Sequence, residues 1–155
     1  MPNWFSASSP SDSVVITGAS SGIGAACALA LDTLGYRVFA GVRNPADGER
    51  LQQQAGPRLM PIRLDVTDPA SISAASHTVA AMVGDRGLAG LVNNAGIGVA
   101  GPIELLPLAD WRRQFEVNVF GLIAVTQTFL PLIRTGRGRI INMGSIAGRA
   151  SMPFM

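Results

Sequence analysis

The sequence has 155 residues, of which 48% are hydrophobic and 14% are charged, and its formal net charge is +2. These values fit one globular domain with a substantial apolar core and argue against intrinsic disorder. The basic residues are scattered singly, which argues against a basic stripe along a nucleic-acid backbone, so no nucleic-acid partner is expected.

Residues 1–13 are polar and contain serines and prolines, without a basic segment or a long apolar run. A secretory signal needs both features, so we expect a flexible leader followed by a single domain at residues 14–155. The only cysteine, Cys27, has no partner for an internal disulfide, which favours a reducing, cytoplasmic compartment. His77 is the only histidine, and without a cluster of further ligands no metal site is expected.

Residues 14–16 form an apolar, β-favouring run that breaks into the turn TGASSGIG at residues 17–24, before an alanine-rich helical pattern. Gly18 permits a sharp turn, whereas Gly22 and Gly24 let a pyrophosphate approach the backbone and let the helix pack closely on the strand. The first N–H groups of that helix and its positive dipole end would face the phosphates. A glycine-rich turn without a ligand is the alternative at this point.

The glycine spacing separates this turn from two other phosphate-binding loops. It is G-x-x-x-G-x-G rather than the G-x-G-x-x-G of larger dinucleotide-binding dehydrogenases. A Walker loop would carry a lysine where Ile23 follows Gly22. ATP hydrolysis is therefore not expected.

Start and stop signals divide the rest of the chain into alternating strands and helices. Gly35 ends the first helix, and Asn-Pro at 44–45 and Asp-Pro at 68–69 each begin another, because these pairs cap a first helical turn. Strands are predicted at residues 14–16, 37–42, 59–64, 89–93 and 139–143, and helices at residues 25–34, 44–55, 68–83 and 109–134. Polar residues and a proline interrupt the apolar run at 115–133, which favours a buried helix over a membrane span.

Strands that alternate with helices predict βαβ units and a parallel sheet with helices on both faces, which is the doubly wound α/β fold. In such sheets the ligand lies beyond the carboxyl ends of the strands, near the point where the strand order reverses. The residues at or just after the five strand ends are Gly18, Val42, Asp65, Asn94 and Ser145. We therefore expect them to lie around one ligand site.

Five motifs mark these strand ends and the long helix: TGASSGIG at residues 17–24, LDVT at 64–67, NNAG at 93–96, Asn118, and NMGS at 142–145. In this order and spacing they resemble the short-chain dehydrogenase/reductase family, and the resemblance covers nearly the whole chain after the leader. It implies a single Rossmann domain and an NAD(P)-dependent oxidoreductase. Such an enzyme transfers a hydride between a nicotinamide cofactor and a small-molecule carbonyl or alcohol substrate.

The resemblance places cofactor contacts at four strand ends. Residues 20–23 would hold the pyrophosphate, Asp65 and Val66 would contact the adenine, and residues 94–96 would line the riboses. The predicted cofactor-binding residues are Gly18, Ser20, Ser21, Gly22, Ile23, Gly24, Arg43, Asp65, Val66, Asn94, Ala95 and Gly96. Structural alternatives stay open, since Asp65 can cap a turn and the paired asparagines at 93–94 can tie strand ends together.

The end of the second strand bears on which dinucleotide binds. An acidic residue there would accept a hydrogen bond from the ribose 2′-OH of NAD and repel a 2′-phosphate. Val42 occupies that place and Arg43 follows it. A guanidinium pairs well with phosphate, so NADP(H) is predicted in preference to NAD(H), with a solvated surface arginine as the alternative.

The resemblance also implies two catalytic positions, Ser145 and Asn118. In the family a serine positions the substrate oxygen and an asparagine helps to anchor a water relay, while a tyrosine exchanges the proton and a lysine lowers the pKa of that tyrosine. The tyrosine and lysine should follow Ser145 by about a dozen residues. The only tyrosine is Tyr36, however, and no lysine lies near Ser145.

These departures predict that the chain is the N-terminal part of such an enzyme, with a sheet truncated after about the fifth strand and no turnover of its own. An intact parent would be a homodimer or homotetramer, because the long helix commonly packs in the subunit interface of the family. Two other interpretations are a non-catalytic dinucleotide-binding module and a fragment without function.

Overall fold

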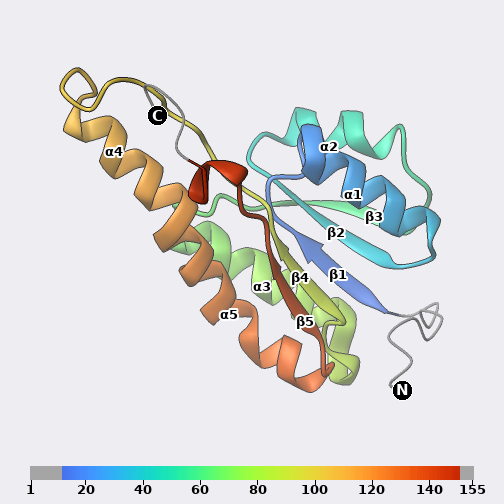
Figure 1. Ribbon diagram of the computed structural model, residues 1–155. Coiled ribbons are helices and arrows are strands. Elements are labelled where there is room, and N and C mark those ends of the chain that lie inside the picture. The colour runs from blue at the N-terminus through green and yellow to red at the C-terminus, as the bar shows by residue number, and fades with distance from the viewer. Residues whose placement is uncertain (1–11, 151–155) are drawn as a thin grey trace.

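The computed structural model describes residues 12–150 and contains one parallel sheet with helices on both faces (Figure 1). The strands are β1 (Ser13–Ile16), β2 (Arg37–Val42), β3 (Leu59–Arg63), β4 (Gly90–Asn93) and β5 (Arg139–Asn142). The helices are α1 (Gly22–Thr33), α2 (Pro45–Gln52), α3 (Pro69–Val83), α4 (Leu108–Phe115) and α5 (Leu122–Thr135). Ser13, expected in the leader, is the first residue of β1, and residues 1–11 lie outside the described residues.

The strand order β3-β2-β1-β4-β5 determines where a ligand can bind. β1 lies at the centre, and its Val15 pairs with Phe39 of β2 on one side and Leu91 of β4 on the other. The chain builds outward from β1 through β2 to β3, then returns to the other side of β1 for β4 and β5. The order therefore reverses between β1 and β4, which is where doubly wound sheets bind their ligands.

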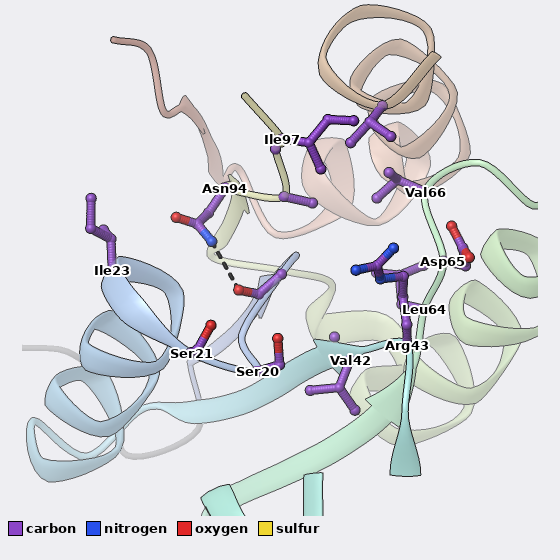
Figure 2. Close-up of a pocket in the computed structure, with 15 residues that line it drawn as sticks. Ser20, Ser21, Ile23, Val42, Arg43, Leu64, Asp65, Val66, Asn94 and Ile97 are labelled. Atoms are coloured by element: carbon purple, nitrogen blue, oxygen red, sulfur yellow. Dashed lines mark hydrogen bonds between the residues drawn. The ribbon is translucent and has the colours of Figure 1, made fainter. Parts of the chain in front are cut away.

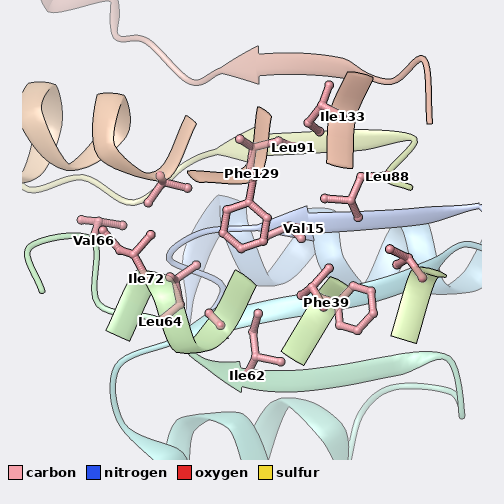
Figure 3. Close-up of a cluster of buried hydrophobic side chains, with 14 residues drawn as sticks. Val15, Phe39, Ile62, Leu64, Val66, Ile72, Leu88, Leu91, Phe129 and Ile133 are labelled. Carbon is pink, nitrogen blue, oxygen red and sulfur yellow. The ribbon is translucent and has the colours of Figure 1, made fainter. Parts of the chain in front are cut away.

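Two apolar clusters hold helices to opposite faces of the sheet. Alternate residues of β1 and β2 pack with α1 and α2 on one face, and the remaining alternate residues pack with α3 and α5 on the other (Figure 1). In the second cluster Phe129 points from α5 toward Val15 and Leu91, and all three are fully buried (Figure 3). The predicted doubly wound α/β architecture is thus confirmed within residues 12–150.

The local start signals of two helices work as predicted. The Asn44 side chain accepts a hydrogen bond from the Ala46 N–H at 3.1 Å, and Pro45 begins α2. The Asp68 side chain accepts one from the Ala70 N–H at 2.9 Å at the start of α3. In both cases the cap satisfies an N–H group that has no partner inside the helix.

The long helix predicted at 109–134 is interrupted in its middle. A π-helical turn at Glu116–Gly121 separates α4 from α5 without a break in direction. Gly121 ends the turn, and a Cβ there would lie 2.8 Å from the carbonyl oxygen of Val66, so only glycine lets this helix approach the segment after β3. Such turns are rare and are frequently found at functional sites.

Large apolar side chains are exposed along this helix and on the edge strand β5. The exposed fractions are 50% for Phe115, 55% for Phe120, 44% for Ile123 and 52% for Ile141. By length and composition alone, Leu108–Thr135 could also cross a membrane, a test that core helices of soluble proteins pass as well. Its opposite face packs on the sheet.

Candidate cofactor-binding site

The turn after β1 brings its backbone against the segment that follows β4. Gly18 has a φ of +65°, and a Cβ there would lie 2.7 Å from Cα of Ala95. A Cβ on Gly24 would collide with the carbonyl oxygen of Gly18 and with Nδ2 of Asn94. Both positions therefore require glycine, because a side chain would separate β1, α1 and β4 at the point where they meet.

Helix α1 begins at Gly22, three residues earlier than predicted. Ser21 occupies the N-cap position in an extended conformation, but its side chain makes no capping hydrogen bond. The first-turn N–H groups of α1 are therefore not covered by a capping side chain and are aligned with the positive end of the helix dipole. This arrangement fits a pyrophosphate group, which would accept hydrogen bonds from those N–H groups.

A network centred on Thr17 joins the ends of β1 and β4. The Thr17 hydroxyl oxygen accepts hydrogen bonds from the N–H groups of Asn94 at 3.0 Å and Ala95 at 2.9 Å. In return, Nδ2 of Asn94 donates to the carbonyl oxygens of Thr17 and Gly18, both at 3.0 Å. Side-chain hydrogen bonds, as well as the backbone hydrogen bonds of the sheet, thus join β1 and β4 at the point where the strand order reverses, which we call the switch point.

Asn93 extends this connection to the edge strand. Its buried Nδ2 donates to Oγ1 of Thr126 in α5 and to Oδ1 of Asn142 in β5, both at 2.9 Å. The Met143 N–H donates to the Asn93 carbonyl oxygen at 2.9 Å, which continues the ladder beyond β5. One side chain therefore ties together β4, β5 and α5, which is the structural alternative that the sequence offered for the paired asparagines at 93–94.

A cavity of about 350 Å³ lies beyond the carboxyl ends of the strands (Figure 2). Ser20, Ser21 and Val42 form one wall, and Ile97 and Val66 lie on the opposite wall (Figure 2). Its lining residues are Gly18, Ser20, Ser21, Ile23, Gly41, Val42, Arg43, Leu64, Asp65, Val66, Asn94, Ala95, Gly96, Ile97 and Val117. The cavity thus draws on residues from every strand end from β1 to β4.

Ten of the twelve predicted cofactor residues line this cavity. Gly22 and Gly24 do not, since they shape the turn and the helix start behind it. Sequence reasoning missed four lining residues, Gly41, Leu64, Ile97 and Val117. Gly41, Ile97 and Val117 each adjoin a residue that the strand ends or motifs had singled out, namely Val42, Gly96 and Asn118, and Leu64 lies inside the LDVT motif without having been given a cofactor contact.

Opposite charges meet at one end of the cavity, where Arg43 and Asp65 lie side by side (Figure 2). Partial burial raises the pKa of the Asp65 carboxyl, but hydrogen bonds from the N–H and the hydroxyl of Thr67, at 2.9 and 2.8 Å, lower it. The positive charges of Arg43 and Arg63 lower it as well, so the pKa of Asp65 lies below its ordinary value. Asp65 is therefore a carboxylate at neutral pH.

The two predicted catalytic positions lie outside the cavity lining. Asn118 lies in the π-helical turn, where its Oδ1 accepts from the Ile97 N–H at 2.9 Å and its Nδ2 donates to the Ile97 carbonyl oxygen at 2.8 Å. Ser145 is exposed after β5, and its hydroxyl oxygen accepts from the Ala147 N–H at 3.2 Å. Asn118 thus positions a residue of the cavity wall, and Ser145 lies at the end of the strand beside β4.

A group of three or more histidine, cysteine, aspartate or glutamate side chains that could hold a metal ion is not found among residues 12–150. Cys27 is partly buried against the α1 side of the core, and His77 is exposed on α3. Besides the Asp65 carboxylate, the cavity offers the serine hydroxyls, the Arg43 guanidinium and the backbone N–H groups at the start of α1, and these groups are ligands for phosphate.

The family model of the short chain dehydrogenases matches residues 12–155. The chain belongs to this short-chain dehydrogenase family. Its Rossmann fold, its glycine-rich turn and the motifs at its strand ends are those of a family of NAD(P)-dependent oxidoreductases, as the resemblance implied.

Named relatives include dehydrogenases of alcohols and steroids. The chain is 44% identical to mouse retinol dehydrogenase 5 over 137 residues, which are 88% of this chain and 43% of that protein. It is 44% identical to human 17-beta-hydroxysteroid dehydrogenase type 2 over 142 residues, 90% of this chain and 37% of that protein. The chain therefore spans less than half the length of these relatives.

Solved structures agree with this assignment. A 7 alpha-hydroxysteroid dehydrogenase complexed with NADH and 7-oxo glycochenodeoxycholic acid superposes with a TM-score of 0.83 and 30% identity, over 93% of this chain and 57% of that chain. Serine dehydrogenase from Escherichia coli superposes with the same TM-score and 29% identity, over 92% of this chain and 66% of its own.

Proposed function

We propose that this chain forms the cofactor-binding part of an NAD(P)-dependent oxidoreductase that transfers a hydride between a nicotinamide cofactor and a carbonyl or alcohol carbon. The observation that carries the proposal is the cavity at the switch point, with the uncapped start of α1 beside it. Family membership supports it, and so do relatives named as dehydrogenases of retinol and 17-beta-hydroxysteroids. A carbonyl or hydroxyl group on a largely apolar molecule is accordingly the substrate class we propose.

The cofactor would lie across the reversal of strand order. Its pyrophosphate would accept hydrogen bonds from the first N–H groups of α1, near Ser20 and Ser21. Its adenosine half would extend toward Arg43 and Asp65 on the β2 side, which leaves the β4 and β5 side for the nicotinamide half. A nicotinamide cofactor supplies the hydride or accepts it.

Ser145 is suited to orient the substrate, because its hydroxyl can both donate to and accept from a carbonyl or alcohol oxygen. Asn118 would act indirectly, by holding Ile97 in the cavity wall. Proton exchange needs a further acid and base, for which the family pattern uses a tyrosine and a lysine. Because the only tyrosine, Tyr36, precedes β2, we propose that this chain alone does not turn over substrate.

NADP(H) is the cofactor that we propose in preference to NAD(H). The cavity end at β2 presents Val42 and the Arg43 guanidinium and lacks a carboxylate at the position that would bind a free ribose 2′-OH. Asp65 lies beside Arg43, and it would face the adenine rather than the 2′-phosphate. A charge-assisted pair between Arg43 and the 2′-phosphate would favour NADPH.

Titration of the chain with NADPH and NADH, followed by cofactor fluorescence, tests both parts of the proposal. We expect NADPH to bind more tightly, and Arg43→Asp to weaken NADPH binding by roughly ten- to a hundredfold, as loss of a charged hydrogen bond would. Arg86→Asp makes the same charge change in the exposed 3-10 turn that follows α3 and should leave binding nearly unchanged. Equal effects of the two substitutions would refute a direct role for Arg43, and absence of any dinucleotide binding would refute the function.

A non-catalytic dinucleotide-binding module is the second candidate, favoured by the absence of a tyrosine near Ser145 in the sequence. The coding sequence immediately downstream of Met155 separates the two. An in-frame Tyr-x-x-x-Lys at the family distance would support the oxidoreductase, and a stop codon would support the module.

We further propose that the parent protein is a cytoplasmic homodimer or homotetramer. The lone Cys27 supports a reducing compartment. The exposed side chains of Phe115, Phe120 and Ile123 support an interface along the long helix.

A further inference from the structure

The segment that follows the NNAG motif is held against the long helix by hydrogen bonds. It contains no helix or strand between β4 and α4, yet both backbone groups of Ile97 are bonded to the side chain of Asn118. Two residues later, the Val99 N–H donates to Oε1 of Gln114 at 2.8 Å. The helix therefore holds residues 97–99 through three backbone hydrogen bonds, and two different side chains provide them.

The spacing of these two side chains matches the spacing of the backbone groups that they bind. Gln114 near the end of α4 and Asn118 in the π-helical turn are four residues apart, so they lie close together along one face of the long helix, about 6 Å apart along its axis. Residues 97 and 99 of an extended chain lie about 6.7 Å apart, with their N–H groups on the same side. The spacing of the two acceptors along the helix thus nearly equals the spacing of alternate N–H groups along an extended chain. Asn118 provides the first acceptor and Gln114 the second.

Gln114 itself does not line the cofactor cavity, but the segment that it holds does. Ile97 lies on the cavity wall opposite Ser20 and Val42, beside Val66 (Figure 2). Without the second acceptor, the side chains of the helix would bind the backbone of residues 97–99 by hydrogen bonds at Ile97 alone. The wall would then occupy its binding-competent position for a smaller fraction of the time, and the apparent affinity for a ligand would fall by that fraction.

From this geometry we infer that Gln114 is a positioning residue for the cofactor cavity, which acts through the Val99 N–H to hold the Ile97 wall in place. The inference rests on the proposed function, since the ligand of the cavity is taken to be NADP(H). It extends the role of the helix beyond Asn118 to a residue that the sequence motifs do not include.

Four versions of the chain test the inference: the parent, Gln114→Leu, Gln114→Glu and the control Gln127→Leu. The leucine removes the acceptor at nearly constant volume, whereas the glutamate keeps an oxygen that can accept from the Val99 N–H. Gln127 is an exposed residue of α5, so its replacement controls for an added leucine on the same long helix. The measurements are NADPH titrations at high ionic strength, which screens the added carboxylate from the phosphates, and hydrogen exchange of the Val99 amide.

We expect Gln114→Leu to weaken NADPH binding about three- to tenfold and to speed exchange of the Val99 amide, while Gln114→Glu and Gln127→Leu stay close to the parent. Rescue by glutamate is the result that a role in stability alone would not produce. Unchanged affinity in Gln114→Leu, despite faster exchange at Val99, would overturn the inference and leave the proposed function intact. Equal loss in the leucine and glutamate variants would also overturn it. If the parent binds neither NADPH nor NADH, the proposed function fails and the inference fails with it.

Discussion

Asp65 shows how two roles can coexist in a single side chain. Its Oδ1 accepts two hydrogen bonds from Thr67 and so caps the turn that leads to α3, which is the structural alternative considered from the sequence. The carboxylate nevertheless lines the cavity beside Arg43. The turn fixes the orientation of the carboxylate, and a second oxygen is available to a ligand, so capping prepares the site rather than competing with it.

The lowered pKa of Asp65 predicts a dependence of stability on pH. A carboxylate whose pKa is depressed on folding stabilises the fold above its unfolded pKa of about 3.9, and this contribution is lost as the pH falls through the folded value. Asp65→Asn should therefore destabilise the chain by up to about 0.5 kcal/mol at pH 6, a small value because the group is only partly buried and solvent screens its charge, and by much less near pH 3. Urea unfolding at several pH values measures this, and a difference that grew on acidification would contradict the sign.

Asn93 connects three elements, which makes the edge strand dependent on side-chain bonding. All four residues of β5 are exposed, so the strand is held by its ladder to β4 and by the bond between the side chains of Asn93 and Asn142. Asn142→Ala leaves part of the buried Asn93 amide without a partner and should lower the free energy of unfolding by about 1–2 kcal/mol.

Asn142→Asp serves as the matched control for this prediction. Its carboxylate keeps an acceptor for Nδ2 of Asn93, so it should restore most of the stability that the alanine variant loses. Hydrogen exchange of the β5 amides, read alongside urea unfolding, would locate the effect. If aspartate proves as harmful as alanine, the bond between the two side chains does not hold the strand.

The sequence predicted the structure best where a feature depends only on residues that are close together in the sequence. The Asn-Pro and Asp-Pro pairs cap α2 and α3 as predicted, because a cap needs only the residues of one turn. The early start of α1 at Gly22 was missed, since the pattern of apolar residues begins after the turn. The π-helical turn was missed as well, and its Asn118 binds Ile97, which lies 21 residues earlier in the sequence. Gln114 was missed for a similar reason, since its partner Val99 lies 15 residues earlier in the sequence.

Across the whole molecule, the exposed apolar side chains of the long helix predict self-association. Burial of one phenylalanine is worth roughly 1.5–3 kcal/mol, so Phe120→Glu should weaken association of the chain by at least about tenfold. Sedimentation velocity across a concentration series would measure it, with Arg58→Glu, at an exposed residue before β3, as a control away from the long helix. A chain that stays monomeric at every concentration would contradict this prediction.

The bonds between Thr17 and Asn94 span 77 residues, so the two halves of the site are synthesised at different times. A ribosome that adds roughly 5–20 residues per second needs about 4–15 s to pass from one to the other. During that interval the glycine-rich turn has been synthesised, but Asn94, which binds it, and Ile97 of the cavity wall have not. Cofactor therefore cannot guide the first steps of folding during synthesis. It can act only at a late stage, by stabilising chains in which β4 has already paired with β1.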